Sequence, residues 1–270
     1  MIYICIPSFN EGTTIGVLLW RIRKVFQGYS REYEILVYDD GSTDETAEVL
    51  APYADVAPLT VMRGDSRKGY AHALDTLARE ASRRTKYPRR DAMVVMQADF
   101  TDQPELLPDL IKRFEGGVDI VIGERAPAGQ PAAVKKLRSL ASWAMRFSAG
   151  STGLADPFAS YRLYRISLIR ELLKADGAKP LASTHGWAAN LELLAAALPL
   201  ARRVERFEVK SRYDLRVRPS RISPLADAMA LYRFGRTIKG KKISLPSQPA
   251  TSEQGVSGPR PGRPKERATS

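Results

Sequence analysis

Cysteine and histidine are scarce in this sequence, and their scarcity excludes several kinds of site. The 270 residues include one cysteine and two histidines. A single cysteine cannot form an internal disulfide or a cysteine-rich zinc site. His72 and His185 have no cysteine near them in the sequence, so a histidine-based zinc site is not expected either. Cys5 lies in the apolar run of residues 1–7, where we expect it to be a buried apolar filler.

Long apolar runs are also missing. No window approaches the roughly 18 apolar residues that a membrane-spanning helix needs. The sequence opens directly on an apolar strand pattern, without a charged leader. We therefore expect a cytoplasmic protein rather than a secreted one.

Acidic residues are fewer than basic ones, and the net charge is +12. The excess is concentrated in residues 202–242, which hold thirteen Lys or Arg against four Asp or Glu. This bias suits an anionic partner, whether phosphate, nucleic acid or an acidic membrane face. It does not choose among them, and a solvated basic surface has the same composition.

The first half of the chain alternates between strand and helix patterns. Its apolar runs are short, uninterrupted and rich in Ile and Val, which is typical of parallel strands covered on both faces. Repeated strand–helix units predict an α/β fold with a mostly parallel, doubly wound sheet. The predicted strands are residues 2–6, 35–38, 59–62, 92–96 and 118–122, and apolar stripes at helical spacing occupy 15–26, 70–81 and 107–114.

The second half is predicted to hold three helices and two strands, followed by a tail. The helices are expected at 131–147, 187–198 and 225–238, and the strands at 158–164 and 204–209. Residues 246–270 have almost no apolar side chains and are expected to be disordered. We divide the chain into a domain over 1–222, a basic amphipathic helix over 223–245 and the tail. The amphipathic helix suits an anionic membrane surface.

Two adjacent carboxylates, Asp39 and Asp40, follow the predicted strand at 35–38. In open α/β sheets ligands bind outside the carboxyl ends of the strands, and a carboxylate there can accept hydrogen bonds from a base or a ribose. A structural alternative also fits the residues. Ser42-x-x-Glu45 matches a capping box, and Asp-Gly is common in turns.

Four other polar segments follow predicted strands. They are Pro7–Glu11, Arg63–Gly69, Gln97–Asp102 and Gly123–Arg125. Each one alone has a turn or cap explanation. Together they bring Asn10, Glu11, Lys68, Asp99 and Arg125 to the edge that carries Asp39, which is the convergence expected of a ligand site.

The motifs in this order resemble family 2 glycosyltransferases of the GT-A fold, and among them the dolichol- or polyprenyl-phosphate sugar synthases. The matching elements are Pro-x-Phe-Asn-Glu, Asp-Asp-Gly-Ser-x-Asp-x-Thr, Lys-Gly-x-Ala and x-Ala-Asp with Pro-Glu. The likeness continues at Asp156–Arg162, which is similar to the family's Asp-x-x-Ser-Gly-Phe-Arg, and at Arg212 and Pro219–Arg221. It implies a Rossmann-like sheet and an inverting transfer of a sugar from a UDP- or GDP-linked donor to polyprenyl phosphate.

The resemblance also implies roles for individual residues. Asp39 would hold the base, Asp40 would lie near the ribose, and Asp99 would bind Mg²⁺ or Mn²⁺ on the donor diphosphate. The implied nucleotide-sugar site consists of Pro7, Asn10, Glu11, Asp39, Asp40, Lys68, Gly69, Gln97, Ala98 and Asp99, the metal ligands are Asp99, Gln97 and Thr101, and the catalytic residues are Asp99, Arg125, Asp156 and Arg212.

Two departures from the family pattern bear on these roles. Gln97 stands where the family has the first Asp of Asp-Ala-Asp, so a neutral amide replaces a charged ligand. A Gln carbonyl can still coordinate a hard cation, and Thr101 or Asp102 could compensate for the lost charge. Ala159-Ser160 replaces the family's Ser-Gly and is expected to narrow the acceptor side.

Other functions stay open on the sequence alone. A transferase acting on a sugar hydroxyl would need a general base, with Asp156 as the first candidate and Glu192 as the second. Gln97 is compatible with a catalytically silent nucleotide-sugar binder. A nucleic-acid-binding protein fits the basic charge, but the motifs follow strand ends rather than a basic helix, so no specific nucleic-acid partner is expected. Trp20, Trp143 and Trp187 are expected to pack in the protein.

Overall fold

The computed structural model describes residues 1–125, 159–177, 179–184 and 186–209, together with 229 and 233. The expected helix at 131–147, the tail at 246–270, and the helix at 225–238 apart from residues 229 and 233 lie outside the described residues. The domain boundaries at 222 and 245 lie there too, so they remain predictions.

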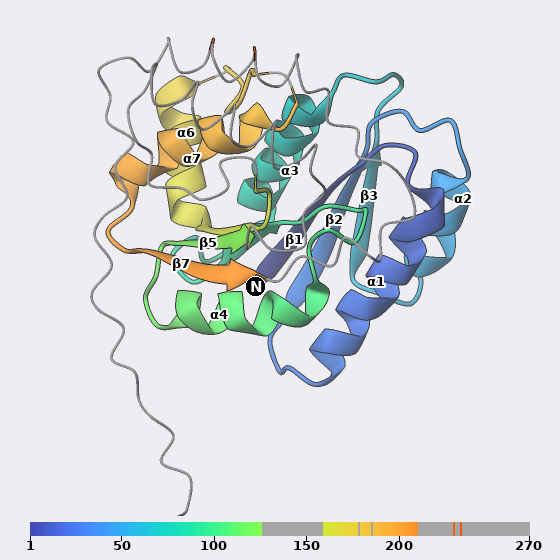
Figure 1. The fold of residues 1–270 in the computed structure, drawn as a ribbon, viewed down its shortest axis with the longest axis horizontal. Coiled ribbons are helices and arrows are strands. Elements are labelled where there is room, and N and C mark those ends of the chain that lie inside the picture. The colour runs from blue at the N-terminus through green and yellow to red at the C-terminus, as the bar shows by residue number, and fades with distance from the viewer. Residues whose placement is uncertain (126–158, 178, 185, 210–228, 230–232, 234–270) are drawn as a thin grey trace, which may run out of the picture.

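A mixed sheet forms the centre of the fold (Figure 1). In the described part of the chain it has seven strands in the order β3-β2-β1-β4-β6-β5-β7. All are parallel except β6, which pairs antiparallel with both β4 and β5. The strands are β1 (Ile2–Ser8), β2 (Tyr33–Asp39), β3 (Leu59–Arg63), β4 (Ala92–Val95), β5 (Ile120–Arg125), β6 (Arg162–Arg165) and β7 (Val204–Val209).

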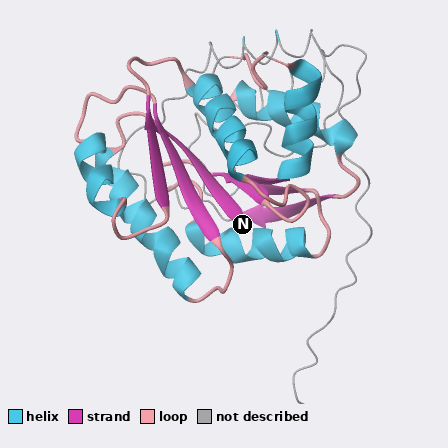
Figure 2. Cartoon of the chain, turned by 180° about the vertical axis from the view of Figure 1, so that it is seen from behind, coloured by secondary structure: helices cyan, strands magenta, loops and turns pink. Residues whose placement is uncertain are grey.

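Helices cover both faces of this sheet, as the uninterrupted apolar strands predict. Helices α3, α6 and α7 lie on one face and α1 and α4 on the other, as Figure 1 and the reverse view in Figure 2 show. The helices are α1 (Gly12–Gln27), α2 (Thr46–Leu50), α3 (Tyr70–Arg84), α4 (Leu107–Glu115), α6 (Ile166–Asp176) and α7 (Ala188–Ala197), with short 3₁₀ turns η1 (Ala51–Tyr53), η2 (Pro104–Leu106) and η3 (Leu198–Leu200).

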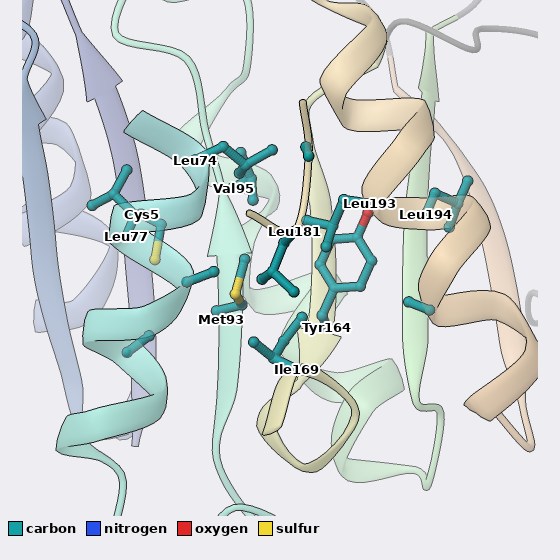
Figure 3. Packing of buried hydrophobic residues seen from close by; sticks show 14 of the residues in the cluster. Cys5, Leu74, Leu77, Met93, Val95, Tyr164, Ile169, Leu181, Leu193 and Leu194 are labelled. Atoms are coloured by element: carbon teal, nitrogen blue, oxygen red, sulfur yellow. The ribbon is translucent and has the colours of Figure 1, made fainter. Parts of the chain in front are cut away.

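The alternation of side chains along each strand divides the core into two clusters. In β1, Ile4 and Ile6 pack toward α1 and α4, while Tyr3 and Cys5 pack toward α3. Figure 3 shows the α3 side, where Cys5, Leu77 and Met93 meet between sheet and helix. The same alternation decides which face of the sheet the last residue of each strand occupies.

The predicted strands and helices of the first half are confirmed, and so are the strands at the positions of β6 and β7 and the helix at α7. The sequence analysis missed helix α6. Its signal is the spacing of Ile166, Ile169 and Leu172, which are buried on the α3 side of the sheet. The run directly follows a strand without a turn residue, so the two elements read as one apolar segment.

Trp20 is a further correction. It is 50% exposed on α1, with the Lys24 ammonium 5.5 Å from its ring centroid, so it is not a core residue. Trp187 packs against the cluster that contains α3, as predicted. None of the described helices is both long enough and apolar enough to cross a membrane.

Cys5 provides a direct test of the core. It has no exposed surface, and burial raises the pKa of its thiol far above the usual range. Because the thiolate is the reactive form, a thiol reagent should not label the native protein and should label one thiol per chain in denaturant. Rapid labelling at neutral pH without denaturant would contradict the burial of β1 between the two helical layers.

Candidate functional site

The parallel strands end along one edge of the sheet, and the predicted polar segments meet there. The last residues of β1, β2, β3, β4 and β5 are Ser8, Asp39, Arg63, Val95 and Arg125. Since neighbouring strands lie about 4.8 Å apart and β1 separates β2 from β4, Asp39 is roughly 10 Å from the segment that follows β4. A nucleoside diphosphate can bridge such a span.

The elbow after β1 is held by the loop after β2. Three successive backbone N–H groups of the elbow donate to side chains of residues 42–46, which satisfies the first donors of α1 from outside that helix. The bonds run from Asn10 N to Ser42 Oγ (2.7 Å), from Glu11 N to Thr46 Oγ1 (2.8 Å) and from Gly12 N to Asp44 Oδ2 (3.1 Å). The loop is therefore a cap for α1.

This arrangement corrects the capping-box alternative. Helix α2 begins at Thr46, and its N-cap residue Glu45 makes no side-chain cap hydrogen bond. Ser42 accepts from Asn10 in the other loop instead. Gly41 instead allows the loop after β3 to approach the loop after β2, because its φ is +72° and a Cβ there would lie 2.9 Å from the backbone carbon of Ser66.

Asp39 is the last residue of β2 and Asp40 follows it outside the strand, and their carboxylates bind different loops. Asp39 is 1% exposed. Its Oδ1 accepts from Ser42 N at 3.0 Å, and its Oδ2 lies 3.5 Å from Arg63 Nε. Oδ2 is buried and has no hydrogen-bond partner among the described residues. Asp39 therefore presents one oriented acceptor, as its predicted role in binding a base requires.

Asp40 has a positioning role. Its two oxygens accept from the backbone N–H groups of Lys68 (2.8 Å) and Gly69 (2.7 Å), which lead into α3. Gly69 has a φ of +97°, which glycine adopts without strain. The carboxylate thus joins the end of β2 to the start of α3, and the Lys68 side chain is left exposed.

Ser8 belongs to the same site and was not singled out from the sequence. It pairs in register with Asp39, so both side chains lie on the same face of the sheet. Ser8 is buried, and its hydroxyl has no hydrogen-bond partner in the described part of the chain. The sequence gives no signal for Ser8, because serine before a turn is common. Its place in the site is shown only by its pairing with Asp39 in the sheet.

The loop after β4 is held in a tight conformation by its own polar groups. Phe100 has a φ of +61° with its side chain in the core, and Ala98 is buried. The Asp99 Oδ1 accepts from the backbone N–H of Thr101 at 3.0 Å and from the Thr101 hydroxyl. Thr101 is predicted to be a metal ligand, and its hydroxyl donates to Asp99 and orients that carboxylate.

Asp102 is buried behind Gln97 and binds its backbone. It has no exposed surface, and its Oδ2 accepts from Gln97 N (2.9 Å) and from Ser160 Oγ (2.8 Å). The Gln97 amide donates from Nε2 to Ser160 Oγ at 2.8 Å. Its Oε1 is buried without a hydrogen-bond partner among the described residues.

The residues present can accommodate a divalent cation, although they do not form a carboxylate cluster. The described residues contain no group of three or more His, Cys, Asp or Glu that could hold a metal ion. Asp99 supplies one carboxylate, and Gln97 Oε1 supplies a carbonyl oxygen that no described group hydrogen-bonds. Both are oxygen donors of the kind that Mg²⁺ and Mn²⁺ accept.

The remaining predicted catalytic residues are only partly placed. Arg125 ends β5, so its backbone lies at the same edge, while Asp156 and Arg212 lie outside the described residues. Glu192, the second general-base candidate, has a carboxylate that accepts from the backbone N–H groups and the hydroxyls of Ser183 and Thr184. Pro7 lies in β1, one residue before Ser8.

Residues 3–173 match the sequence profile of the family described as glycosyl transferase family 2. The dolichol-phosphate mannosyltransferase of Pyrococcus furiosus is 36% identical over 126 residues, which is 47% of this chain and 33% of that protein. The undecaprenyl-phosphate 4-deoxy-4-formamido-L-arabinose transferase of Photorhabdus laumondii is 27% identical over 171 residues, which is 63% of this chain and 51% of that protein. The matched parts are thus a third to a half of these relatives.

Solved structures confirm the GT-A fold. The glucosyl-3-phosphoglycerate synthase of Mycobacterium tuberculosis, crystallised with Mn²⁺, UDP and phosphoglyceric acid, superimposes with a TM-score of 0.59. The alignment covers 86% of this chain and 75% of that one, at 19% sequence identity. Its complex with UDP alone gives a TM-score of 0.61 at 18% identity. At this level of identity the likeness shows the fold alone.

The pH dependence of the unfolding free energy tests whether the Asp44 carboxylate stabilises the elbow after β1. Burial raises the pKa of its carboxyl, but hydrogen bonds from the Thr46 hydroxyl and from the N–H groups of Gly12 and Thr46 outweigh burial and hold the pKa below its usual 3.8. Because the folded pKa is the lower one, the carboxylate stabilises the fold fully above pH 3.8 and loses this effect as the pH falls through the folded value. Asp44→Asn should cost about 1 kcal/mol of unfolding free energy near neutral pH.

Urea denaturation between pH 7 and the acid limit of folding measures this difference. The gap between wild type and Asp44→Asn should stay constant down to about pH 4 and then shrink. Asp55→Asn, which changes an exposed carboxylate in another loop, is the matched control and should behave as wild type. A gap that persists unchanged in acid would mean that the Asp44 charge is not what caps α1.

Proposed function

The chain belongs to glycosyl transferase family 2, and from this premise we propose that it transfers a sugar from a nucleotide-sugar donor to a polyprenyl phosphate, with inversion at the anomeric carbon. The observation that carries the proposal is a pair of buried oxygen acceptors along one sheet edge. Asp39 Oδ2 and Gln97 Oε1 each lack a hydrogen bond among the described residues, at strand ends two positions apart. Buried acceptors without donors are costly, so they fit a ligand that supplies the missing partners.

Two relatives support a lipid phosphate as acceptor, since the names of both specify a dolichol or undecaprenyl phosphate. A phosphate monoester has its second pKa near about 6, so its oxygen is already anionic at neutral pH. Such a nucleophile needs no general base. The engagement of Glu192 by Ser183 and Thr184 agrees with this choice, although it does not test Asp156.

The mechanism proposed for the described residues is positioning. Asp39 fixes the base, and Asp40 holds the turn at Lys68 and Gly69 against the end of β2. Thr101 orients Asp99, which with Gln97 Oε1 would hold Mg²⁺ or Mn²⁺. When bound there, the ion would neutralise charge on the departing nucleoside diphosphate. The acceptor oxygen attacks the anomeric carbon opposite that diphosphate, a new C–O bond forms, and the sugar–diphosphate bond breaks.

We further propose that the enzyme works at the cytoplasmic face of a membrane, because a polyprenyl phosphate is anchored there. Residues 202–242 carry the basic excess of the chain. Lys and Arg near an anionic surface contribute about 1 kcal/mol each to binding. A peripheral association of this kind requires no membrane-spanning helix.

Uridine is the base that the Asp39 site fits best. Its Oδ1 is already bonded to Ser42 N, which leaves Oδ2 for one N–H, and Ser8 Oγ on the same face can donate to an adjacent carbonyl. Uracil presents this pattern at N3–H and a neighbouring carbonyl oxygen. Guanine carries a second, adjacent amino donor, which would have to share Oδ1 of Asp39 with the Ser42 N–H. Cytosine presents the reverse pattern, with an acceptor at N3.

The reaction is tested by transfer of label from UDP- and GDP-sugars into organic-extractable phosphopolyprenol, with Mn²⁺ or Mg²⁺. We expect label in the organic phase that disappears on chelation and falls at least a hundredfold in Asp99→Ala. Asp55→Ala should retain full transfer, since that carboxylate is exposed and away from the sheet edge. Label that reaches only water-soluble acceptors with hydroxyl groups would contradict the proposed lipid-phosphate acceptor. Nucleotide binding without any transfer would favour a protein that binds the nucleotide sugar without catalysis.

The base preference is tested by calorimetric titration with UDP, GDP and CDP. Wild type should bind UDP at least tenfold more tightly than GDP or CDP. Asp39→Asn can keep the bond to Ser42 through its carbonyl while its NH₂ faces the base, so UDP binding should fall about tenfold to a hundredfold. CDP binding should fall less, because cytosine N3 accepts from that NH₂. Equal affinity for UDP and GDP in wild type would contradict the single-acceptor argument.

A further inference from the structure

The two departures from the family pattern, Gln97 and Ser160, are hydrogen-bonded to one another. They come from distant parts of the sequence and meet where the start of β6 lies beside the end of β4. Gln97 is 6% exposed, Ser160 1% and Asp102 0%. The three bonds that join them measure 2.8 to 2.9 Å, and they close a buried ring through the Gln97 amide, the Ser160 hydroxyl, the Asp102 carboxylate and the Gln97 backbone N–H.

The protons of this network can be placed in one way only. A carboxylate only accepts, so Ser160 must donate its single hydroxyl hydrogen to Asp102. Its oxygen can then only accept from Gln97, and the amide atom facing it must be Nε2. Flipping the amide would set two acceptors against each other inside the protein, which is costly. The Gln97 carbonyl is therefore fixed on the opposite side of the amide.

That carbonyl oxygen is the atom left without a hydrogen bond in the described part of the chain. A carboxylate at position 97 would present an acceptor in either orientation, because its two oxygens are equivalent. An amide presents an acceptor in one orientation and a donor in the other. A glutamine can thus take the place of an acidic ligand only if something holds its orientation, and a glycine at position 160 has no side chain to do so.

We propose that Ser160 and Asp102 are positioning residues that lock the Gln97 amide with Oε1 toward the cation held by Asp99, so that Gln97 and Ser160 act as one coupled unit. The inference rests on the proposed function, because it assigns the oriented carbonyl to the metal of that site. The fixed orientation of the Gln97 amide offsets part of the affinity lost with the carboxylate charge. A coordinating side chain that is already held in its binding orientation loses less entropy when the cation binds.

The test is Mn²⁺ affinity, measured from the EPR signal of free Mn²⁺ with saturating UDP, independently of transfer. Ser160→Gly in the wild-type background should weaken Mn²⁺ binding about tenfold, since the amide becomes free to turn its NH₂ toward the site. In the Gln97→Asp background the same substitution should cost less than threefold, because a carboxylate needs no lock. Thermal denaturation of all four proteins shows whether a change in affinity merely follows loss of structure.

The outcomes separate this inference from the proposed function. Equal losses in the two backgrounds would make Ser160 a structural residue and overturn the coupling, and so would no loss in either. Wild type that binds no Mn²⁺ while still transferring label in the presence of chelator would overturn the cation role of Gln97 and leave glycosyl transfer intact. A tenfold loss confined to the Gln97 background supports the lock.

Discussion

The site depends on the hydrogen bonds that the loop after β2 accepts from the elbow after β1. Ser42, Asp44 and Thr46 receive three successive N–H groups at the start of α1. These donors belong to a helix end, where no intrahelical acceptor exists. By supplying the acceptors from a separate loop, the fold joins two strand ends and a helix into one rigid corner. Asp39 leaves β2 inside this corner, so its carboxylate is oriented before any ligand binds.

The same corner explains why two adjacent carboxylates are needed. Asp39 ends β2 and binds the loop at Ser42, while Asp40, just past the strand, binds the turn at Lys68 and Gly69. Both oxygens of Asp40 accept hydrogen bonds from backbone N–H groups, whereas one oxygen of Asp39 accepts none from the described residues. One residue of the pair therefore builds the site and the other is left for a ligand, although the sequence shows them as equivalent neighbours.

The fold and the location of the site could be predicted from the sequence, but the division of roles could not. Apolar runs and helical stripes place the strands and helices of the first half, and the strand ends place the polar segments at one edge. Periodicity says nothing about partners distant in the chain. The pairing of Ser8 with Asp39 and the commitment of Glu192 to Ser183 and Thr184 arise from tertiary contacts. The hydrogen bonds of Thr101 to Asp99 and of Asp102 to Ser160 likewise could not be read from spacing, which shows proximity and not direction.

The neutral amide at position 97 acts on the electrostatics of the edge in two opposing ways. It removes one negative charge that would attract a cation, and it removes the same charge from the neighbourhood of an anionic donor diphosphate. A site with fewer carboxylates repels a diphosphate less. Asp102 and Asp40 add little to that repulsion, because backbone N–H groups, with a hydroxyl at Asp102, already solvate their carboxylates. Because the site attracts a cation less strongly, its ligand atoms need to be held in their binding positions before a cation arrives. The closed network around Gln97 meets that requirement, since every polar group in it except the carbonyl oxygen is engaged in a hydrogen bond.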